Sequence, residues 1–305
     1  MPTPASSNTG QAMRQVLSAA AAHLEHAGVP AARVDAELLA AHVCGLGRSE
    51  LLLTREFPGA LLARYWQLLE RRAAREPLQH LTGETGFRYL TLEVRAGVFV
   101  PRPETEMVAE AAILAAQGAT WAAAAGAPGP VRVVDLCTGA GGIALACAQE
   151  VPGAQVWAVD LSPEAVALTR ANAERNALTV SVLEGDVHDA ALLTELHGTV
   201  DVVVSNPPYI PFECEPLEAE VRDYDPPAAL YGGGVDGLAV PIAVIQRARE
   251  LLRPGGTLII EHGDGQGRAM REHVERQGGF REIHTQQDLT NRDRMVVAAR
   301  DQVAH

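Results

Sequence analysis

The sequence contains no lysine, and all 25 of its basic residues are arginine. This absence excludes chemistry that needs an amine side chain, such as a Schiff base, a lysine general base or the lysine of a phosphate-binding P-loop. The arginines are outnumbered by 38 acidic residues, which leaves a formal net charge of −13. Because non-specific binding to polyanions depends on many basic contacts with phosphates, we expect no direct binding of nucleic acid.

Cysteine is also scarce, with four residues that show neither CxxC pairs nor the spacing of metal ligands. We therefore expect buried or idle thiols and no metal site. The first ten residues lack the basic and apolar regions of a signal peptide, and no apolar run reaches the length of a membrane span. These observations predict a cytoplasmic protein that does not contact membranes.

The acidic residues are unevenly distributed. Residues 1–100 carry 10 arginines and 9 acidic residues, whereas residues 101–305 carry 15 arginines and 29 acidic residues. A shift of this kind favours two regions with different partners. We expect an N-terminal helical, substrate-recognition domain at 1–84, a β-hairpin linker at 85–100 and a second domain at 101–305.

Apolar residues recur at helical spacing between residues 11 and about 76, which predicts a small helical bundle. From Phe87 to Val100 they alternate with period two, which predicts a strand pair or hairpin with Gly97 near a bend. A helix is expected from about Glu104, and the Gly/Ala/Pro-rich stretch 117–130 is expected to be a connecting loop.

From residue 131 onward, short apolar strands alternate with helices. The expected strands are 131–136, 155–159, 180–183, 201–205, 257–260 and 295–299. The expected helices are 143–149, 163–176, 239–252 and 267–277. This alternation predicts an α/β domain with a doubly wound, mostly parallel sheet that is covered on both faces.

A glycine-rich turn, Cys137-Thr138-Gly139-Ala140-Gly141, follows the first strand of this sheet. Such a turn fits NAD, FAD or S-adenosylmethionine, and it also occurs with no ligand. Asp160 ends the second strand, where an acidic residue can accept hydrogen bonds from a ribose. Asp186 follows the third strand, and it either reaches an adenine amine or is a plain turn aspartate.

A rigid polar loop, Asn206-Pro207-Pro208-Tyr209, follows the fourth strand at the same edge of the sheet. The Asn206 side-chain carbonyl and the Pro207 backbone carbonyl can each accept one hydrogen of a planar NH₂ group. Two prolines fix the backbone, and Tyr209 offers a flat face for an amide or a base. Because the nitrogen of such a group is a poor nucleophile, holding both hydrogens aims its lone pair at a methyl donor.

These motifs resemble those of class I S-adenosylmethionine-dependent methyltransferases that modify amino groups. Three further stretches, at 75–83, 100–106 and 230–238, are similar to the HemK/PrmC family of protein-(glutamine-N5) methyltransferases. That family methylates the glutamine of the Gly-Gly-Gln motif in peptide chain release factors. The resemblance implies a Rossmann-like catalytic domain after a helical domain and a β hairpin, S-adenosyl-L-methionine as cofactor with S-adenosyl-L-homocysteine as product, release factors as partners, and a monomer.

The resemblance also implies roles for individual residues. Those expected to line the cofactor are Cys137, Thr138, Gly139, Ala140, Gly141, Asp160, Asp186, Val187 and Asn206. Asp160 would hold the ribose, Asp186 and Val187 would lie by the adenine, and 206–209 would hold the glutamine amide as the catalytic loop. The family commonly has glycine in place of Cys137, so a cysteine there suggests that φ need not be positive. We expect its thiol to pack rather than to act as a nucleophile.

Several alternatives stay open. An adenine-N6 methyltransferase of nucleic acids would present the same NH₂ geometry but is disfavoured by the acidic charge. A nicotinamide-dependent oxidoreductase would leave the 206–209 loop unexplained. A non-catalytic binding module would tolerate loss of Asn206, so the presence of Asn206 argues against it. Arg102 either positions the substrate or pairs with Glu104 or Glu106, and Glu261-His262 is expected to be a structural pair rather than a metal or base site. The acidic segment 213–225 is either a solvated flap or one that contacts protein.

Overall fold

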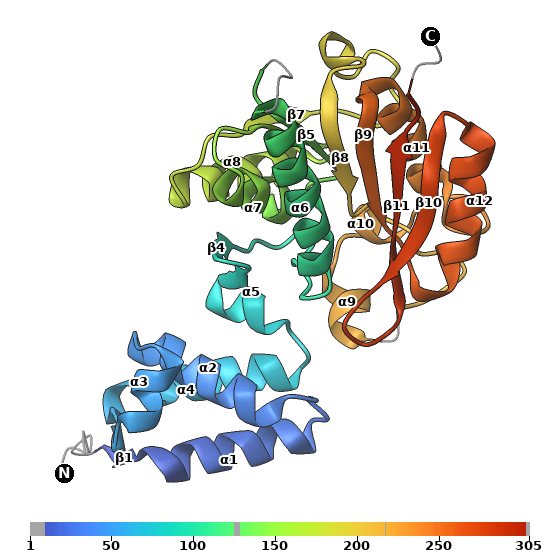
Figure 1. The fold of residues 1–305 in the computed structure, drawn as a ribbon. Helices are drawn as coiled ribbons and strands as arrows, with labels where there is room; N and C mark the ends of the chain where they lie inside the picture. Colours follow the sequence, from blue (N-terminus) through green and yellow to red (C-terminus); the bar gives the residue numbers. More distant parts are fainter. Residues whose placement is uncertain (1–9, 125–128, 217, 303–305) are drawn as a thin grey trace, which may run out of the picture. The chain divides into compact units, whose positions relative to one another are not determined.

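The structure, a computed structural model, describes residues 10–124, 129–216 and 218–302 (Figure 1). The chain forms two compact units. The helical unit contains the described residues of Met1–Gly83 and of Leu217–Tyr224, and the sheet unit contains those of Glu84–Pro216 and of Asp225–His305. The short segment 218–224 therefore belongs with the N-terminal helices, although it interrupts the sheet unit in the sequence.

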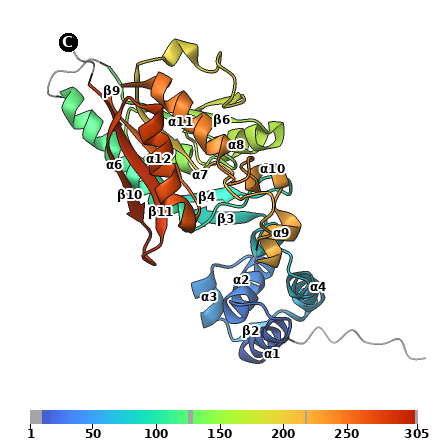
Figure 2. The ribbon, with the colours of Figure 1, turned by 90° about the vertical axis from the view of Figure 1, so that its right-hand side faces the viewer.

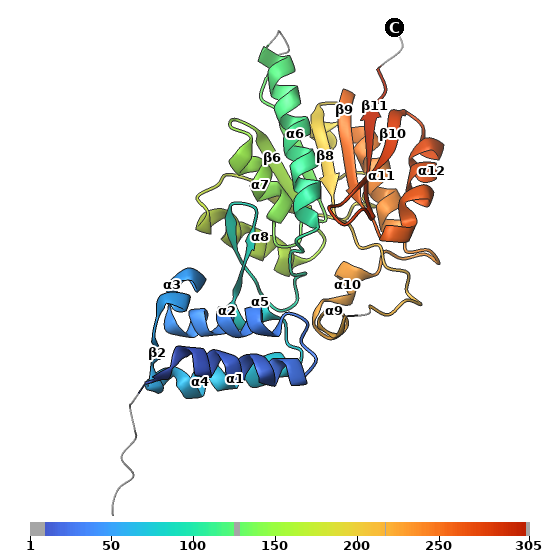
Figure 3. The same cartoon turned by 60° about the horizontal axis from the view of Figure 1, so that its bottom comes forward.

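The helical unit is built from helices whose apolar faces cover one another. Its elements are β1 (Gln11–Ala12), α1 (Met13–His26), α2 (Ala32–Cys44), α3 (Arg48–Leu53), β2 (Glu56–Phe57), the 3-10 helix Gly59–Leu61, α4 (Leu62–Ala73), α5 (Leu78–Thr82) and α9 (Ala219–Tyr224). Helices α1, α2 and α4 pack side by side (Figure 3). Their core contains Leu17, Leu39 and Tyr65, and the Tyr65 hydroxyl donates to the carbonyl oxygen of Ala36 at 2.8 Å. The predicted helical bundle is confirmed.

The sheet unit begins with the expected β hairpin, but its turn is not where the alternation placed it. Strands β3 (Glu84–Phe87) and β4 (Leu90–Glu93) pair with Phe87 opposite Leu90, so Arg88 and Tyr89 form the turn. Arg88 has a φ of 52°, as two-residue hairpin turns require. Gly97 lies beyond β4, in a turn where the Val98 amide donates to Arg95 O at 3.3 Å, so it is near a bend but not near that of the hairpin. Neither arginine nor tyrosine favours a turn, so these two residues did not indicate the position of the hairpin turn.

Helix α6 (Thr105–Ala124) starts where Pro103 and the acidic residues around it predicted a helix. It continues through residues 117–124, and the prediction that this stretch is part of a loop is wrong there. Alanine has the highest helix propensity, and a single glycine such as Gly118 costs only about 1 kcal/mol. The expected loop also covers 125–128, which lie outside the described residues.

A seven-stranded sheet with the order β10–β11–β9–β8–β5–β6–β7 organises the sheet unit. Its strands are β5 (Arg132–Leu136), β6 (Gln155–Asp160), β7 (Ser181–Glu184), β8 (Val200–Ser205), β9 (Leu252–Glu261), β10 (Phe280–Gln287) and β11 (Asp293–Arg300). Strands β7, β6, β5, β8 and β9 run parallel, and β11 is antiparallel to both of its neighbours. The predicted doubly wound, mostly parallel sheet is confirmed, and β10 was not predicted.

Helices cover both faces of the sheet. The remaining helical elements are α7 (Gly142–Glu150), α8 (Pro163–Arg175), the 3-10 helix Thr194–Leu196, α10 (Pro227–Leu230), α11 (Ala239–Leu251), the 3-10 helix Asp264–Gln266 and α12 (Gly267–Gln277). Val133 and Val202 pack under α6 and α7, whereas Val134 and Val203 face the core formed with α11 and α12. Figure 2 shows α6 and α11 on opposite sides of the strands. Within the described ranges, no helix is long and apolar enough to cross a membrane.

Candidate active site

The two predicted motifs leave the sheet from neighbouring strands. β5 and β8 are adjacent and parallel, and Leu136 pairs with Ser205 at the end of each. The Ser205 hydroxyl donates to the Leu136 carbonyl oxygen at 2.5 Å, which ties the two strand ends together. The sheet order reverses between these strands, and doubly wound sheets bind their ligands at such a point. Cys137 and Asn206 therefore start the turn and the loop side by side.

Two glycines shape the turn after β5. Gly139 and Gly141 have φ values of 58° and 88°, which glycine adopts without strain. A Cβ atom on Gly141 would lie 2.9 Å from Thr169 Cγ2, whereas one on Gly139 would meet nothing within 4 Å. The turn is therefore packed against α8 on one side and open on the other. This open backbone, at the start of α7, fits a nucleotide-type cofactor.

Asp160 fastens the turn to β6. Its Oδ2 accepts a hydrogen bond from the Gly139 amide at 2.8 Å, and its Oδ1 accepts one from the Ser162 amide at 2.9 Å. Burial raises the pKa of Asp160, and these backbone donors oppose the rise. Because a carboxylate accepts about four hydrogen bonds, Asp160 keeps capacity for ribose hydroxyls. Its contact with a ribose stays a prediction.

Asp186 and Val187 follow β7 at the same edge of the sheet. Asp186 Oδ1 accepts hydrogen bonds from the backbone amide and from Nδ1 of His188, both at 2.8 Å. These bonds lower the pKa of Asp186. Val187 is buried beside it. Asp186 thus has the local bonds of a turn aspartate, and the adenine contact of this pair stays a prediction.

Cys137 has a φ of 61°, in the left-handed region. The expectation that φ need not be positive there is wrong. The position suits glycine, and a side chain costs roughly 1–2 kcal/mol. The partly buried Cys137 packs against the core that the sheet forms with α11 and α12, and burial raises the pKa of its thiol. A thiol that stays protonated is a poor nucleophile, as the sequence reading expected.

Asn206 is oriented by the first residue of α6. Its Nδ2 donates to the Thr105 hydroxyl oxygen at 3.1 Å, and Thr105 is buried. Because Nδ2 is held in this way, Oδ1 is left to accept hydrogens from a ligand. Burial also raises the pKa of Tyr209 above its usual value, so its ring carries a neutral hydroxyl. The sequence reading missed Thr105, because nothing near it in the chain points to Asn206.

The glycine-rich segment 230–238 braces the 206–209 loop. The Ile210 amide donates to Leu230 O at 2.9 Å, and the Gly232 amide donates to Ile210 O at 3.1 Å. A Cβ atom on Gly237 would lie 2.3 Å from the carbonyl oxygen of Tyr209, so only glycine allows this approach. The density of glycines was the visible signal, but the sequence alone did not say what they contact.

Side chains from two more helices hold the site together, and the sequence reading missed both. Asn172 on α8 donates to Ala140 O at 2.9 Å and accepts from the Glu93 amide at 2.6 Å, which links the turn to the hairpin. Gln266 donates to Tyr209 O at 2.8 Å. An asparagine inside the expected helix 163–176 was a visible signal, since asparagine is a weak helix former, but its full burial shows only in the structure.

Comparison with known proteins shows which family the chain belongs to. The family model of the PrmC N-terminal domain matches residues 15–83, and that of the methyltransferase small domain matches residues 127–213. The release factor glutamine methyltransferase of Bifidobacterium longum is 43% identical over 93% of this chain and 98% of its own length. The chain belongs to the release factor glutamine methyltransferase family.

Two further family members support this assignment. The enzyme of the same name from Mycolicibacterium smegmatis is 45% identical over 94% of this chain and 98% of its own length. That of Streptomyces coelicolor is 46% identical over 90% of this chain and 93% of its own length. The resemblance inferred from the motifs is therefore confirmed.

Arg102, from one of the stretches that pointed to the family, forms an ion pair with Asp225 rather than with the expected Glu104 or Glu106. Its guanidinium carbon also lies 4.8 Å from the centre of the Phe99 ring. Asp225 is buried and lies 123 positions away in the sequence, which is why local spacing could not identify it. Arg102 therefore has a structural partner on the segment after the 206–209 loop.

Glu261 and His262 end β9 and are both buried. Nδ1 of His262 donates to Gly263 O at 2.8 Å, and burial lowers its pKa, so the ring is neutral near pH 7. Among the described residues, no cluster of histidine, cysteine, aspartate or glutamate could hold a metal ion. The structural role expected for His262 fits these contacts.

The described residues of the acidic segment 213–225 are partly exposed and partly paired. Glu213, Glu215 and Glu218 are exposed, as in a solvated flap. Glu220 instead forms ion pairs with Arg72 and Arg75 inside the helical unit. The contact of Glu220 lies within this chain, and contact of the segment with another protein stays a prediction.

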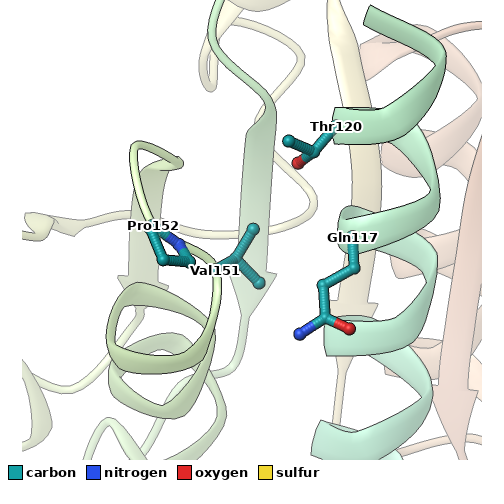
Figure 4. Close-up of a pocket in the computed structure, with 4 residues that line it drawn as sticks. All are labelled: Gln117, Thr120, Val151 and Pro152. Carbon is teal, nitrogen blue, oxygen red and sulfur yellow. The ribbon is translucent and has the colours of Figure 1, made fainter. Parts of the chain in front are cut away.

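A hollow elsewhere in the sheet unit does not belong to the site. It is lined by Gln117, Thr120, Val151 and Pro152 (Figure 4). Gln117 lies twelve residues along α6 from Thr105, about 18 Å at 1.5 Å per residue. The hollow thus lies toward the opposite end of α6 from Asn206.

Proposed function

We propose that this protein transfers a methyl group from S-adenosyl-L-methionine to the side-chain amide nitrogen of the glutamine in the Gly-Gly-Gln motif of peptide chain release factors. The observation that carries the proposal is the hydrogen bond from Asn206 Nδ2 to Thr105, because it leaves Asn206 Oδ1 for an NH₂ group. This oxygen belongs to a loop that starts beside the glycine-rich turn. Membership of the family supports the same substrate.

We infer that the turn 137–141 and Asp160 hold the cofactor. The open side of Gly139 fits a nucleotide-type group, and Asp160 can accept hydrogen bonds from its ribose. Asp186 and Val187 are proposed to lie by the adenine. When bound, the cofactor supplies an electrophilic methyl group on a sulfonium sulfur. We also expect the protein to act as a monomer in the cytoplasm.

The protein's own residues position the substrate nitrogen. The lone pair of a glutamine amide is delocalised into the carbonyl, so the nitrogen is a weak nucleophile. Asn206 Oδ1 accepts one of its hydrogens and the Pro207 carbonyl accepts the other, while Tyr209 supports the planar amide. This arrangement directs the lone pair to the methyl group and stabilises the positive charge that develops on nitrogen. One proton then leaves the nitrogen, and no strong base is needed for that loss.

The test uses labelled S-adenosylmethionine with four substrates: a release factor, its Gly-Gly-Ala variant, DNA and RNA. We expect label only on the intact release factor, and mass spectrometry should place one methyl group on the glutamine. Label on DNA or RNA would instead favour the adenine-N6 reaction. Equal label on the release factor and its variant would contradict the proposal.

A further inference from the structure

The carboxyl group of Glu261 is buried beside the start of the 206–209 loop. β9 is the neighbour of β8, and Ile260 pairs with Ser205, so Glu261 and Asn206 are the next residues on adjacent strands. Glu261 is 2% exposed, and its Oε2 has no hydrogen-bond partner among the described residues. A buried carboxyl with an unsatisfied oxygen costs free energy. Its position therefore calls for an explanation.

Hydroxyl groups connect Glu261 to the loop. The hydroxyls of Thr105 and Tyr209 act on its carboxyl group as hydrogen-bond donors that lower its pKa. Thr105 Oγ1 also accepts the hydrogen bond from Asn206 Nδ2. A threonine hydroxyl has a single hydrogen to donate, and this hydrogen is free for Glu261 because Oγ1 accepts from Asn206. The result is a relay from Asn206 through Thr105 to Glu261.

Charged groups on the neighbouring elements both raise and lower the pKa of this carboxyl group. Burial raises the pKa of Glu261 to about 7, and the charge of Glu104, just before α6, adds to the rise. Arg294 on β11 and the hydroxyls of Thr105 and Tyr209 oppose it. Glu261 therefore changes its charge close to neutral pH.

We propose that Glu261 is a positioning residue for the methyl transfer, which acts through Thr105 to keep Oδ1 of Asn206 turned toward the substrate amide. The inference rests on the proposed function. An ionised Glu261 only accepts hydrogen bonds, so it takes the Thr105 hydrogen and leaves a Thr105 lone pair for Asn206. A protonated Glu261 can donate to Thr105 instead, so that it competes with Asn206 Nδ2 for the lone pairs of the Thr105 oxygen and loosens the hold on the amide. The ionised form is the active one, so the rate rises with pH.

The experiment compares kcat and KM of the full chain with an intact release factor between about pH 5.5 and about pH 9. We expect the wild-type kcat to rise with pH through a midpoint at about 7 and to level off above about pH 8. Thr105→Val keeps the shape of the side chain but cuts the relay, so kcat should fall by about 10–100-fold, with an unchanged KM and no pH rise. Thr105→Ser keeps the hydroxyl and should retain both the rate and the rise.

Two more variants test the carboxyl itself. Glu261→Gln cannot ionise, so its lowered kcat should not vary with pH in this range. Glu104→Gln removes an exposed negative charge that raises the pKa of Glu261, so the midpoint should move to lower pH while the plateau stays unchanged. A residue with a merely structural role would not produce this displacement. Binding of S-adenosyl-homocysteine and thermal melting check that each variant is folded.

The outcomes separate the two hypotheses. If the wild type leaves the release factor glutamine unmethylated, the proposed function fails. If the wild type methylates it but Thr105→Val keeps the same rate or the same pH rise, only the role of Glu261 fails. A rise that persists in both Thr105→Val and Glu261→Gln would belong to another group, such as Asp135, whose pKa burial also raises to about 7.

Discussion

Arg72 and Glu220 lie 148 positions apart in the sequence, yet Arg72 Nη2 donates to Glu220 Oε1 at 2.8 Å. Arg72 also donates through Nε to Asp35 Oδ2 at 2.7 Å, and Arg75 donates to both oxygens of Glu220. Arg72 and Asp35 are buried, and the side chain of Glu220 is 14% exposed. One glutamate of the acidic segment therefore fastens α9 to the N-terminal helices.

We predict that Glu220→Gln destabilises the helical unit at pH 7 by about 1–3 kcal/mol, since hydrogen bonds to charged groups are lost. Burial would raise the pKa of Glu220, but the hydrogen bonds from Arg75 and Arg72 outweigh it and lower the pKa to about 2. A folded-state pKa below the unfolded value of about 4.3 gives stability that is complete above that value. The contribution is lost as the pH falls toward about 2, so urea unfolding of variant and wild type should converge there.

Glu218→Gln is the matched control for this prediction. Glu218 lies two residues away on the same segment and is exposed, so its substitution removes the same charge without a buried ion pair. We expect a change in unfolding free energy within about 0.5 kcal/mol at pH 7. Equal losses for the two variants would mean that net charge, rather than the contact with Arg72 and Arg75, sets the stability.

The turn 137–141 and the 206–209 loop could be located from the sequence because each directly follows an apolar strand. Each also combines residue types that suit the binding of a ligand. The sequence did not place Thr105 or Glu261 beside this loop, since their position depends on where α6 starts and on the register of β8 against β9. Strand β10 was missed because most of its residues are polar and exposed. The pairing of Arg102 with Asp225 likewise depends on tertiary structure. Patterns of neighbouring residues carry local information, and these contacts are long-range.

Cys137 provides a test of backbone strain. Cys137→Gly and Cys137→Ala both remove the thiol, and they differ only in a Cβ atom at a φ of 61°. We predict that the glycine variant is more stable than the alanine variant by about 1 kcal/mol, because glycine adopts positive φ without strain. The same pair at Cys147, which is buried within α7, should show the opposite order by about 1 kcal/mol. Chemical denaturation of the four variants measures both differences.

Substitutions of Gly237 and Gly234, in the segment that braces the 206–209 loop, distinguish the effect of backbone strain from the effect of a close backbone approach. Both have positive φ, at 76° and 72°, so alanine is strained at either position. A Cβ atom on Gly237 would also lie 2.3 Å from Tyr209 O, whereas the nearest atom to one on Gly234 is Asp236 Oδ1 at 3.3 Å. We predict that Gly237→Ala lowers kcat by about 100-fold because it displaces the loop, and that Gly234→Ala keeps most of the activity. Similar kcat values for the two variants would show that the brace does not position the loop.

Asn206→Ala tests the assignment of the loop most directly. The substitution removes Oδ1, the oxygen proposed to accept a substrate hydrogen, and we predict that kcat falls by about 10²–10³-fold. Cofactor affinity should change little, because the proposed cofactor site is held together by the hydrogen bond from the Gly139 amide to Asp160. Asn206 takes no part in that bond. Isothermal titration with S-adenosyl-homocysteine measures that affinity alongside the kinetics. If affinity for the cofactor falls as far as kcat does, Asn206 serves cofactor binding rather than the orientation of the glutamine amide.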